Sequence, residues 1–250
     1  MSKTSIAWTN RTWNPVTGCS KLSAGCAHCY AETMAKRLQG MEQKRYANGF
    51  NLTLHPEALN EPKRIKEPSL FFVCSMADLF HKDVPFEFID KVMNTIKECP
   101  RHTFQILTKR PERMYRYFVE EDREVPGNAW LGTTVENAET ESRIPWLVEI
   151  KMASVRFLSC EPLLSDLGEL NLFNIDWVIV GGESGSQARQ MHKEWVLNIQ
   201  RQCKELGVPF FFKQWGTWGE DGIKRDKKAN GCNIDGVVYQ QWPKAWKGGK

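Results

Sequence analysis

The sequence predicts an α/β protein whose fold is a partial or modified (β/α) barrel. Three observations predict it. Short, almost continuously apolar runs recur from about residue 70 onward, polar or amphipathic stretches separate them, and polar residues follow nearly every run. Such runs are typical of strands that are buried on both faces of a parallel sheet. A doubly wound open sheet is the alternative that the same pattern allows.

Length and composition indicate a folded protein outside the membrane. The 250 residues suit one large domain, or a barrel-sized domain with a small extension. With 41% hydrophobic and 26% charged residues, the chain is neither disordered nor collagen-like. Its longest apolar stretch, Leu70 to Cys74, is far shorter than the ~20 residues that cross a bilayer, and the first ten residues contain no apolar signal region. We therefore expect a cytoplasmic protein.

Six apolar runs are predicted to be strands, and each is short enough for a buried strand. A first strand is expected earlier, near Ser5–Thr9 or just before Cys19, which gives about seven β/α units. The six runs are residues 70–75, 103–108, 130–135, 155–160, 177–181 and 208–213.

Helix signals lie between these runs. In Phe86–Glu98 the apolar residues recur every three or four positions, as on one face of a helix. Pro111 suits the first position of a helix over 112–118. His192–Leu206 has the same periodicity and is followed by Gly207, a typical C-terminal cap.

The C-terminal segment differs in composition from the rest. Residues 216–250 are rich in Gly, Lys and Trp, and contain a turn at Asn233–Gly236 before the strand-like Val237–Tyr239. We therefore predict a barrel over residues 1–215 and a basic extension over residues 216–250.

Polar side chains follow the predicted strands, where a parallel barrel places its reactive groups. Some of them can be solvated loop residues or helix caps. That interpretation accounts poorly for Glu161, which stands between a buried strand and Pro162, and for Gly181-Gly-Glu183 after another strand. We expect a cofactor-lined rim, with Cys160 and Glu161 as catalytic candidates.

The strongest signal is a loop with three cysteines, Cys19, Cys26 and Cys29, in a C-x6-C-x2-C pattern. Disulfides are disfavoured in the cytosol, and thiolates on a short flexible loop can converge on one soft metal centre. One possibility is zinc, with His28 or another side chain as fourth ligand. The other is an iron–sulfur cluster, in which three protein thiolates leave one iron open to a further ligand.

Basic and aromatic residues alternate in two stretches, residues 101–117 and 224–246. This composition suits phosphate contacts combined with base stacking. Solvated helix faces explain it almost as well, and the net charge of +4 is modest. The glycine-rich 181–186 segment fits neither the dinucleotide-binding nor the P-loop pattern.

The three-cysteine loop resembles that of the radical S-adenosylmethionine superfamily. It follows the expected first strand, and His28 stands where the superfamily has an aromatic-type residue before the last cysteine, although the commonest spacing there is C-x3-C-x2-C. The chain also resembles a phage-associated family of unassigned function. The segments that carry this second resemblance are Trp13–Cys19, Ser75–Phe80, Leu107–Arg113, Phe157–Leu164, Trp177–Ser184 and Phe211–Trp215.

The resemblance implies a [4Fe–4S] cluster held by Cys19, Cys26 and Cys29, with S-adenosylmethionine chelated to the open iron. The superfamily's Gly-Gly-Glu motif follows its second strand, whereas Gly181–Glu183 follows the sixth predicted strand, so that role is not transferred to Glu183. The residues that the resemblance assigns to S-adenosylmethionine are Tyr30, Ser75, Asp78, Thr108, Lys109, Glu136 and Asn137.

The implied reaction starts when a low-potential electron donor reduces the cluster, which cleaves S-adenosylmethionine and releases a 5′-deoxyadenosyl radical. Segments 31–69 and 216–250, which we expect at the barrel mouth, are both net basic. We therefore predict repair or modification of a DNA or RNA base that is flipped or single-stranded. The alternative is a zinc-stabilised nucleic-acid-binding or phage accessory protein without catalysis.

Overall fold

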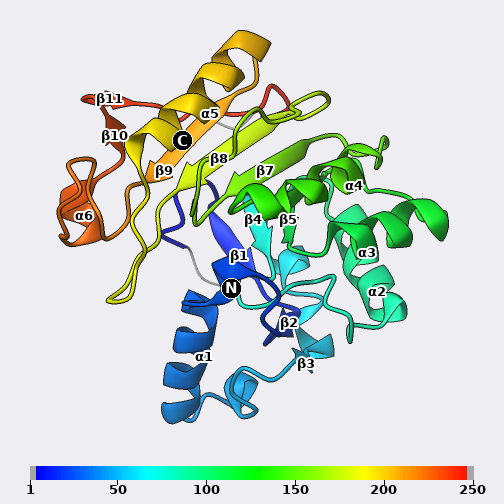
Figure 1. The fold of residues 1–250 in the computed structure, drawn as a ribbon. Coiled ribbons are helices and arrows are strands. Elements are labelled where there is room, and N and C mark those ends of the chain that lie inside the picture. Colours follow the sequence, from blue (N-terminus) through cyan, green and yellow to red (C-terminus); the bar gives the residue numbers. More distant parts are fainter. Residues whose placement is uncertain (1–3, 247–250) are drawn as a thin grey trace. The chain divides into compact units, whose positions relative to one another are not determined.

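Seven strands form one parallel sheet in the computed structural model, which describes residues 4–246 (Figure 1). Residues 247–250 of the expected extension lie outside the described residues. The strand order follows the chain order, as in a (β/α) barrel, whereas a doubly wound sheet reverses its order at a switch point. The expected partial barrel is therefore confirmed. Its strands are β1 (Arg11–Trp13), β4 (Leu70–Val73), β5 (Thr103–Thr108), β6 (Ala129–Thr134), β7 (Arg156–Cys160), β8 (Trp177–Gly181) and β9 (Phe210–Gln214).

The first strand lies later than one of the two expected positions. Residues 5–9 form no strand, and β1 instead pairs in parallel with β4, with Trp13 opposite Val73. Only Trp13 of β1 is buried, so this strand carries no apolar run that a sequence pattern can detect. The other expectation, a strand just before Cys19, corresponds to β2 (Val16–Thr17), which pairs antiparallel with β3 (Thr53–Leu54).

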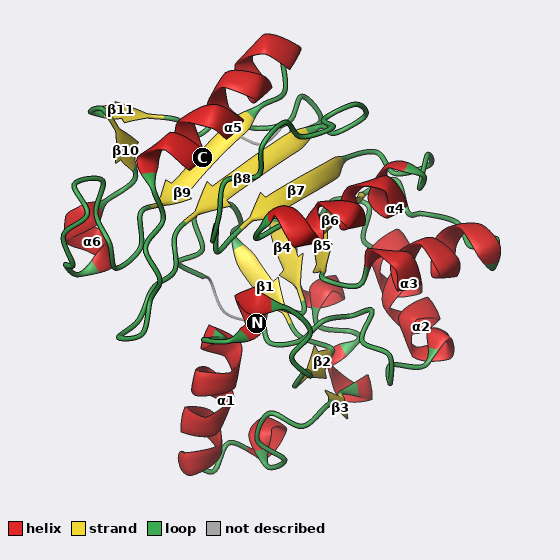
Figure 2. Ribbon diagram, viewed as in Figure 1, coloured by secondary structure: helices red, strands yellow, loops and turns green. Residues whose placement is uncertain are grey.

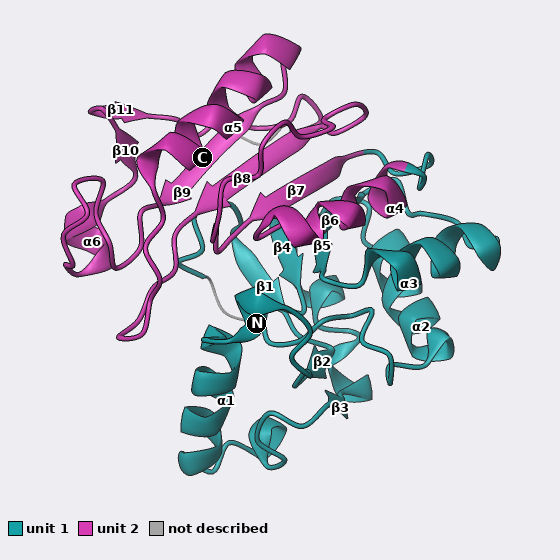
Figure 3. Cartoon of the chain, in the orientation of Figure 1, with its two compact units in different colours: residues 1–132, 149–154 teal, residues 133–148, 155–250 magenta. Residues whose placement is uncertain are grey.

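The chain forms two compact units (Figure 3). Unit 1 comprises residues 1–132 and 149–154, and unit 2 comprises residues 133–148 and 155–250. In the part of the chain that the structure describes, no helix is both long enough and apolar enough to span a membrane.

The described residues of unit 1 form three α-helices, and aromatic rings stack in its core, where the Phe71 and Phe104 ring centroids lie 5.3 Å apart. As predicted, α2 begins at Phe86, and Pro111 opens the next helix. That helix continues as a π-helix, which no periodicity predicted. The helices are α1 (Tyr30–Gly40), α2 (Phe86–Lys97), α3 (Pro111–Tyr115) and the π-helix η5 (Arg116–Glu120), with short 3-10 turns η1 (Ala24–Cys26), η2 (Lys44–Tyr46), η3 (Pro56–Ala58) and η4 (Pro62–Arg64).

In unit 2, a long helix runs alongside β9 (Figure 2). Gly207, with φ of 69°, ends this helix in the left-handed conformation that its sequence position predicts. Residues 235–236 join the two strands of a small hairpin, and Asn233 and Ile234, which the sequence placed in the turn, form its first strand. The elements are η6 (Ala138–Arg143), α4 (Ile144–Val148), α5 (Lys193–Leu206), α6 (Lys227–Asn230), β10 (Asn233–Ile234) and β11 (Val237–Val238).

Candidate functional site: a cysteine loop and paired carboxylates

The cysteine loop of unit 1 runs from Gly18 to Cys29, between β2 and α1. Gly18 has φ of +79°, and a Cβ there would lie 2.2 Å from the Asn51 carbonyl oxygen, so only glycine fits at the start of the loop. Cys26 ends η1, and Cys29 immediately precedes α1. The thiols of Cys19, Cys26 and Cys29 are all free and partly exposed.

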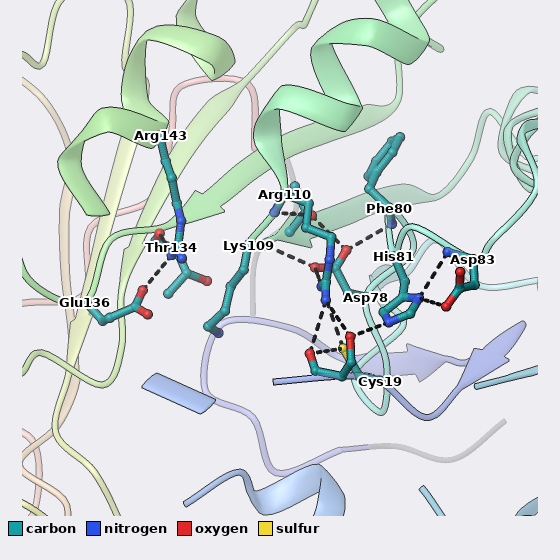
Figure 4. Close-up of polar contacts among 12 residues, drawn as sticks. Cys19, Asp78, Phe80, His81, Asp83, Lys109, Arg110, Thr134, Glu136 and Arg143 are labelled. Atoms are coloured by element: carbon teal, nitrogen blue, oxygen red, sulfur yellow. Dashed lines mark hydrogen bonds and ion pairs between the residues drawn. The ribbon is translucent and has the colours of Figure 1, made fainter. Parts of the chain in front are cut away.

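An arginine that follows β5 holds the start of this loop (Figure 4). Arg110 Nη1 donates to Cys19 Sγ at 3.7 Å, and Nη2 donates to the carbonyl and hydroxyl oxygens of Ser20 at 3.1 and 3.2 Å. Burial and the Asp78 carboxylate raise the pKa of the Cys19 thiol, and Arg110 acts against this rise. The guanidinium is thus placed to compensate negative charge on the loop.

Asp78 is the buried acceptor that fixes Arg110. Its carboxylate accepts from Arg110 Nη1 at 2.9 Å, from the Thr108 hydroxyl at 2.7 Å and from the backbone N–H groups of Phe80 and Lys109 at 2.9 and 3.1 Å. The structure therefore brings together three of the predicted residues, Asp78, Thr108 and Lys109. The sequence placed Arg110 only within the basic and aromatic stretch 101–117, and it did not indicate the contact with Cys19.

A histidine supports the other side of the loop. His81 Nδ1 accepts the backbone N–H of Asp83 at 3.2 Å, so Nε2 carries the proton and donates to Ser20 Oγ at 2.7 Å. Burial lowers the pKa of His81, and the positive charge of Arg110 lowers it further. The ring is therefore kept neutral. No motif in the sequence indicated this residue.

Two further predicted residues of unit 1 lie together. The Tyr30 hydroxyl donates to the carbonyl oxygen of Ser75, although the tyrosine side chain is largely exposed. The Ser75 hydroxyl donates to Asn14 Oδ1 at 3.2 Å, which also accepts the backbone N–H of Met76 at 3.1 Å. The start of α1 is thereby tied to the turn that follows β4.

In unit 2, Glu136 follows β6 and is completely buried. Its carboxylate accepts from Arg143 Nη1 at 2.7 Å, and the same nitrogen donates to the carbonyl oxygen of Thr134 at 2.8 Å (Figure 4). The Thr140 hydroxyl accepts the backbone N–H groups of Glu136 and Asn137 at 3.0 and 3.2 Å. Asn137 thus serves as the N-terminal cap of η6.

The two predicted catalytic residues differ in their environment. Cys160 ends β7 and is fully buried, and burial raises the pKa of its thiol. Glu161 is partly exposed and forms an ion pair with Lys213 of β9. A Cβ at Gly181 would lie 3.2 Å from the Glu161 carboxylate, so a glycine at the end of β8 gives this side chain room. Their catalytic roles stay predictions.

Glu183, in the Gly-Gly-Glu segment, binds a residue of its own loop. Arg189 donates to it from Nε at 2.9 Å, from Nη2 at 2.6 Å and from its backbone N–H at 2.9 Å. This bidentate pairing of guanidinium and carboxylate joins two parts of the same loop. A structural role for Glu183 follows from these contacts.

The donor set of the cysteine loop matches an iron–sulfur centre in its chemistry. Three soft thiols lie within eleven residues, none is in a disulfide, and a guanidinium stands beside the first of them. Among residues 4–246, no three or more His, Cys, Asp or Glu side chains converge as a ready-made metal site. Binding would therefore draw the three thiols together.

Comparison with known proteins assigns the chain to a family. Residues 3–243 match the family described as "Protein of unknown function (DUF5131)", so the chain belongs to that family. None of the curated proteins compared with the chain matches it. The phage association expected from the sequence stays a prediction.

Several solved structures of spore photoproduct lyase are similar to this chain. The complex with dinucleoside spore photoproduct has a TM-score of 0.46 and 12% identity, covering 86% of this chain and 68% of that chain. A double mutant with bound AdoMet and dinucleoside spore photoproduct has a TM-score of 0.44 and 11% identity, covering 78% of this chain and 61% of that chain. A single mutant of spore photoproduct lyase has a TM-score of 0.43 and 10% identity, covering 82% of this chain and 63% of that chain.

Proposed function

We propose that this protein is a radical S-adenosylmethionine enzyme that acts on a base of DNA or RNA. The observation that carries the proposal is the loop with Cys19, Cys26 and Cys29, three free and accessible thiols in eleven residues. They would hold three irons of a [4Fe–4S] cluster and leave the fourth for S-adenosylmethionine. When bound, this group supplies the electron for reductive cleavage of the cofactor's sulfonium centre.

The residues around the loop would hold it in position. Arg110 contacts Cys19 and Ser20, and the Asp78 carboxylate fixes the guanidinium, so its charge stays beside the loop. A fixed cation lowers the free energy of an anionic thiolate-bound group. The other unit 1 residues that we assign to the cofactor contribute polar groups near the loop and the end of β4, and they are Tyr30, Ser75, Thr108 and Lys109.

In unit 2 we assign Glu136 and Asn137 to the cofactor's ribose and Cys160 and Glu161 to catalysis. Of the two catalytic candidates, Glu161 is partly exposed and therefore accessible to a substrate, and the Lys213 ammonium pairs with its carboxylate. Burial raises the pKa of the Cys160 thiol and keeps it protonated, so it would not act as a nucleophile.

Exposed basic residues of unit 2 support a nucleic-acid substrate. Lys227 and Lys228 open α6 and are exposed, and the Lys224 ammonium lies 4.6 Å from the centre of the Trp218 ring. Cations beside an aromatic ring suit contacts with phosphates and bases. The target base would be flipped out or single-stranded to reach the cofactor.

The proposal is tested by reconstituting the chain with iron and sulfide under anaerobic conditions. We expect a brown protein with about four irons per chain, which forms 5′-deoxyadenosine from S-adenosylmethionine when dithionite is added. Cys19→Ala, Cys26→Ala and Cys29→Ala should each lose the iron and the visible absorbance. Cys232→Ala, which removes a partly exposed thiol outside the loop, should retain both.

Two results would contradict the proposal. A colourless protein that holds one tightly bound zinc would favour a non-catalytic role. A protein with a full cluster that binds S-adenosylmethionine but never cleaves it would exclude the reaction.

A further inference from the structure

Large apolar side chains are exposed along one face of α1. Tyr30 is 58% exposed and Met34 40%, and Met41, the residue that follows the helix, is 56% exposed. Steps of four and seven residues place them on one face of a helix. Leu22, within the cysteine loop, is 52% exposed as well. We call Leu22, Tyr30, Met34 and Met41 the α1 patch.

Within unit 1, α1 extends away from the strands (Figure 1). Only Ala31 and Ala35 of its residues are buried, in a small cluster with Met76. Tyr46 and Phe50 pack against this cluster from the segment that follows the helix. Because two alanines bury little area, most of the apolar surface of α1 faces solvent. An apolar surface of this kind on a folded chain marks a binding site for a partner.

Basic residues surround the α1 patch. Lys21 and Lys36 share one carboxylate, that of Glu32, at 3.3 and 2.6 Å. Arg37 and Lys44 are exposed, and neither has an ion-pair partner among residues 4–246. The surface therefore has an apolar centre with an excess of positive charge at its rim, which complements a protein that has an apolar centre and an acidic rim.

The composition of the patch favours a protein over a nucleic acid as its partner. Methionine side chains are flexible and polarizable, and they adapt to different protein surfaces. Nucleic-acid-binding surfaces instead rely on successive aromatic rings for stacking, and the patch contains a single ring, that of Tyr30.

We propose that the α1 patch is the docking surface for a small acidic redox protein that delivers electrons to the cysteine loop. The inference rests on the proposed function, because a centre held by this loop takes its electron from outside the chain. Cys29 immediately precedes α1, so a partner on the patch lies beside the loop. One electron leaves the partner's reduced cofactor and enters the centre, and no bond forms or breaks at the contact.

The test measures binding of two probes, a flavodoxin and a plant-type [2Fe–2S] ferredoxin, to the full chain by calorimetry at low and high salt. At least one probe should bind, and more weakly at high salt. Met34→Glu and Met41→Glu should each weaken binding at least tenfold, because they place a carboxylate opposite an acidic partner. Met152→Glu is the matched control, since Met152 is 54% exposed and lies outside the patch, and it should bind like the parent chain.

Reduction with dithionite separates this inference from the proposed function, because a small reductant needs no docking surface. Met34→Glu should form 5′-deoxyadenosine at the parent rate with dithionite and at least tenfold more slowly with the reduced probe. Equal binding of the probes to all variants, or no binding to the parent chain at low salt, would overturn the docking surface. A dimer in which the patch joins two copies of this chain, detected by sedimentation, would also overturn the docking surface. A chain that forms no cluster contradicts the proposed function, and the binding measurement still decides the role of the patch.

Discussion

At the residue scale, Asp78 organises the surroundings of the cysteine loop. Its carboxylate accepts four hydrogen bonds, and its side chain is 8% exposed while that of Arg110 is 11% exposed. Breaking a buried ion pair by removing one partner leaves the other charge uncompensated, which costs more than the pair itself contributes. Arg110 in turn reaches Cys19, so the loop depends on this carboxylate.

We therefore predict that Asp78→Asn lowers the free energy of unfolding by about 3 kcal/mol, because an amide keeps an acceptor for Thr108 but leaves Arg110 without a counter-charge. Urea denaturation of the metal-free chain measures this. Asp221→Asn is the control, since the Asp221–Arg225 pair has side chains 50% and 40% exposed and exposed pairs contribute little. Equal destabilisation by the two substitutions would show that Asp78 has no special structural role.

At the scale of elements, the six predicted apolar strands lie within two residues of the observed bounds. They were predictable because most of their residues are buried, which favours nearly continuous apolar runs. In contrast, β1 was misplaced because it is held by pairing with β4 rather than by its own composition. The π-helix η5 also has no sequence signature, because it departs from the helical period by one residue.

The same difference separates the predictable and unpredictable parts of the candidate site. Asp78, Thr108 and Lys109 were expected together, because neighbouring parallel strands β4 and β5 end at the same edge of the sheet. The contacts of Arg110 with Cys19 and of His81 with Ser20 join residues more than 60 positions apart. They depend on how a long loop folds back, and local patterns do not encode that.

The helix α5 gives a prediction at this scale. Gly207 has φ of +69°, and no atom lies within 4 Å of the position of an added Cβ, so Gly207→Ala would suffer backbone strain without a clash. We expect this substitution to lower the free energy of unfolding by about 1 kcal/mol. Gly127→Ala is the control, because Gly127 has no positive φ and no neighbour within 4 Å. It should leave stability unchanged or slightly raised, and equal losses in urea denaturation would refute the strain argument.

For the whole molecule, the net charge of +4 arises from 34 basic and 30 acidic residues. Many of these residues form ion pairs, such as Lys97 with Glu124 at 2.5 Å. The charge available to a polyanion therefore lies on unpaired, exposed cations. Lys227 and Lys228 are exposed at the start of α6, and neither has an ion-pair partner among residues 4–246.

We expect the chain to bind DNA or RNA with an affinity that falls as salt rises, because bound phosphates release counterions. If Lys227 and Lys228 each contact one phosphate of duplex DNA, replacing both with Ala lowers the slope of log K against log salt by about 2. Lys97→Ala should leave the slope unchanged, because Glu124 already neutralises Lys97. A fluorescence titration over a salt series measures these slopes. Binding weaker than ~100 µM at low salt is weaker than ordinary non-specific binding, and it would redirect the proposed chemistry from a nucleic-acid base to a small substrate.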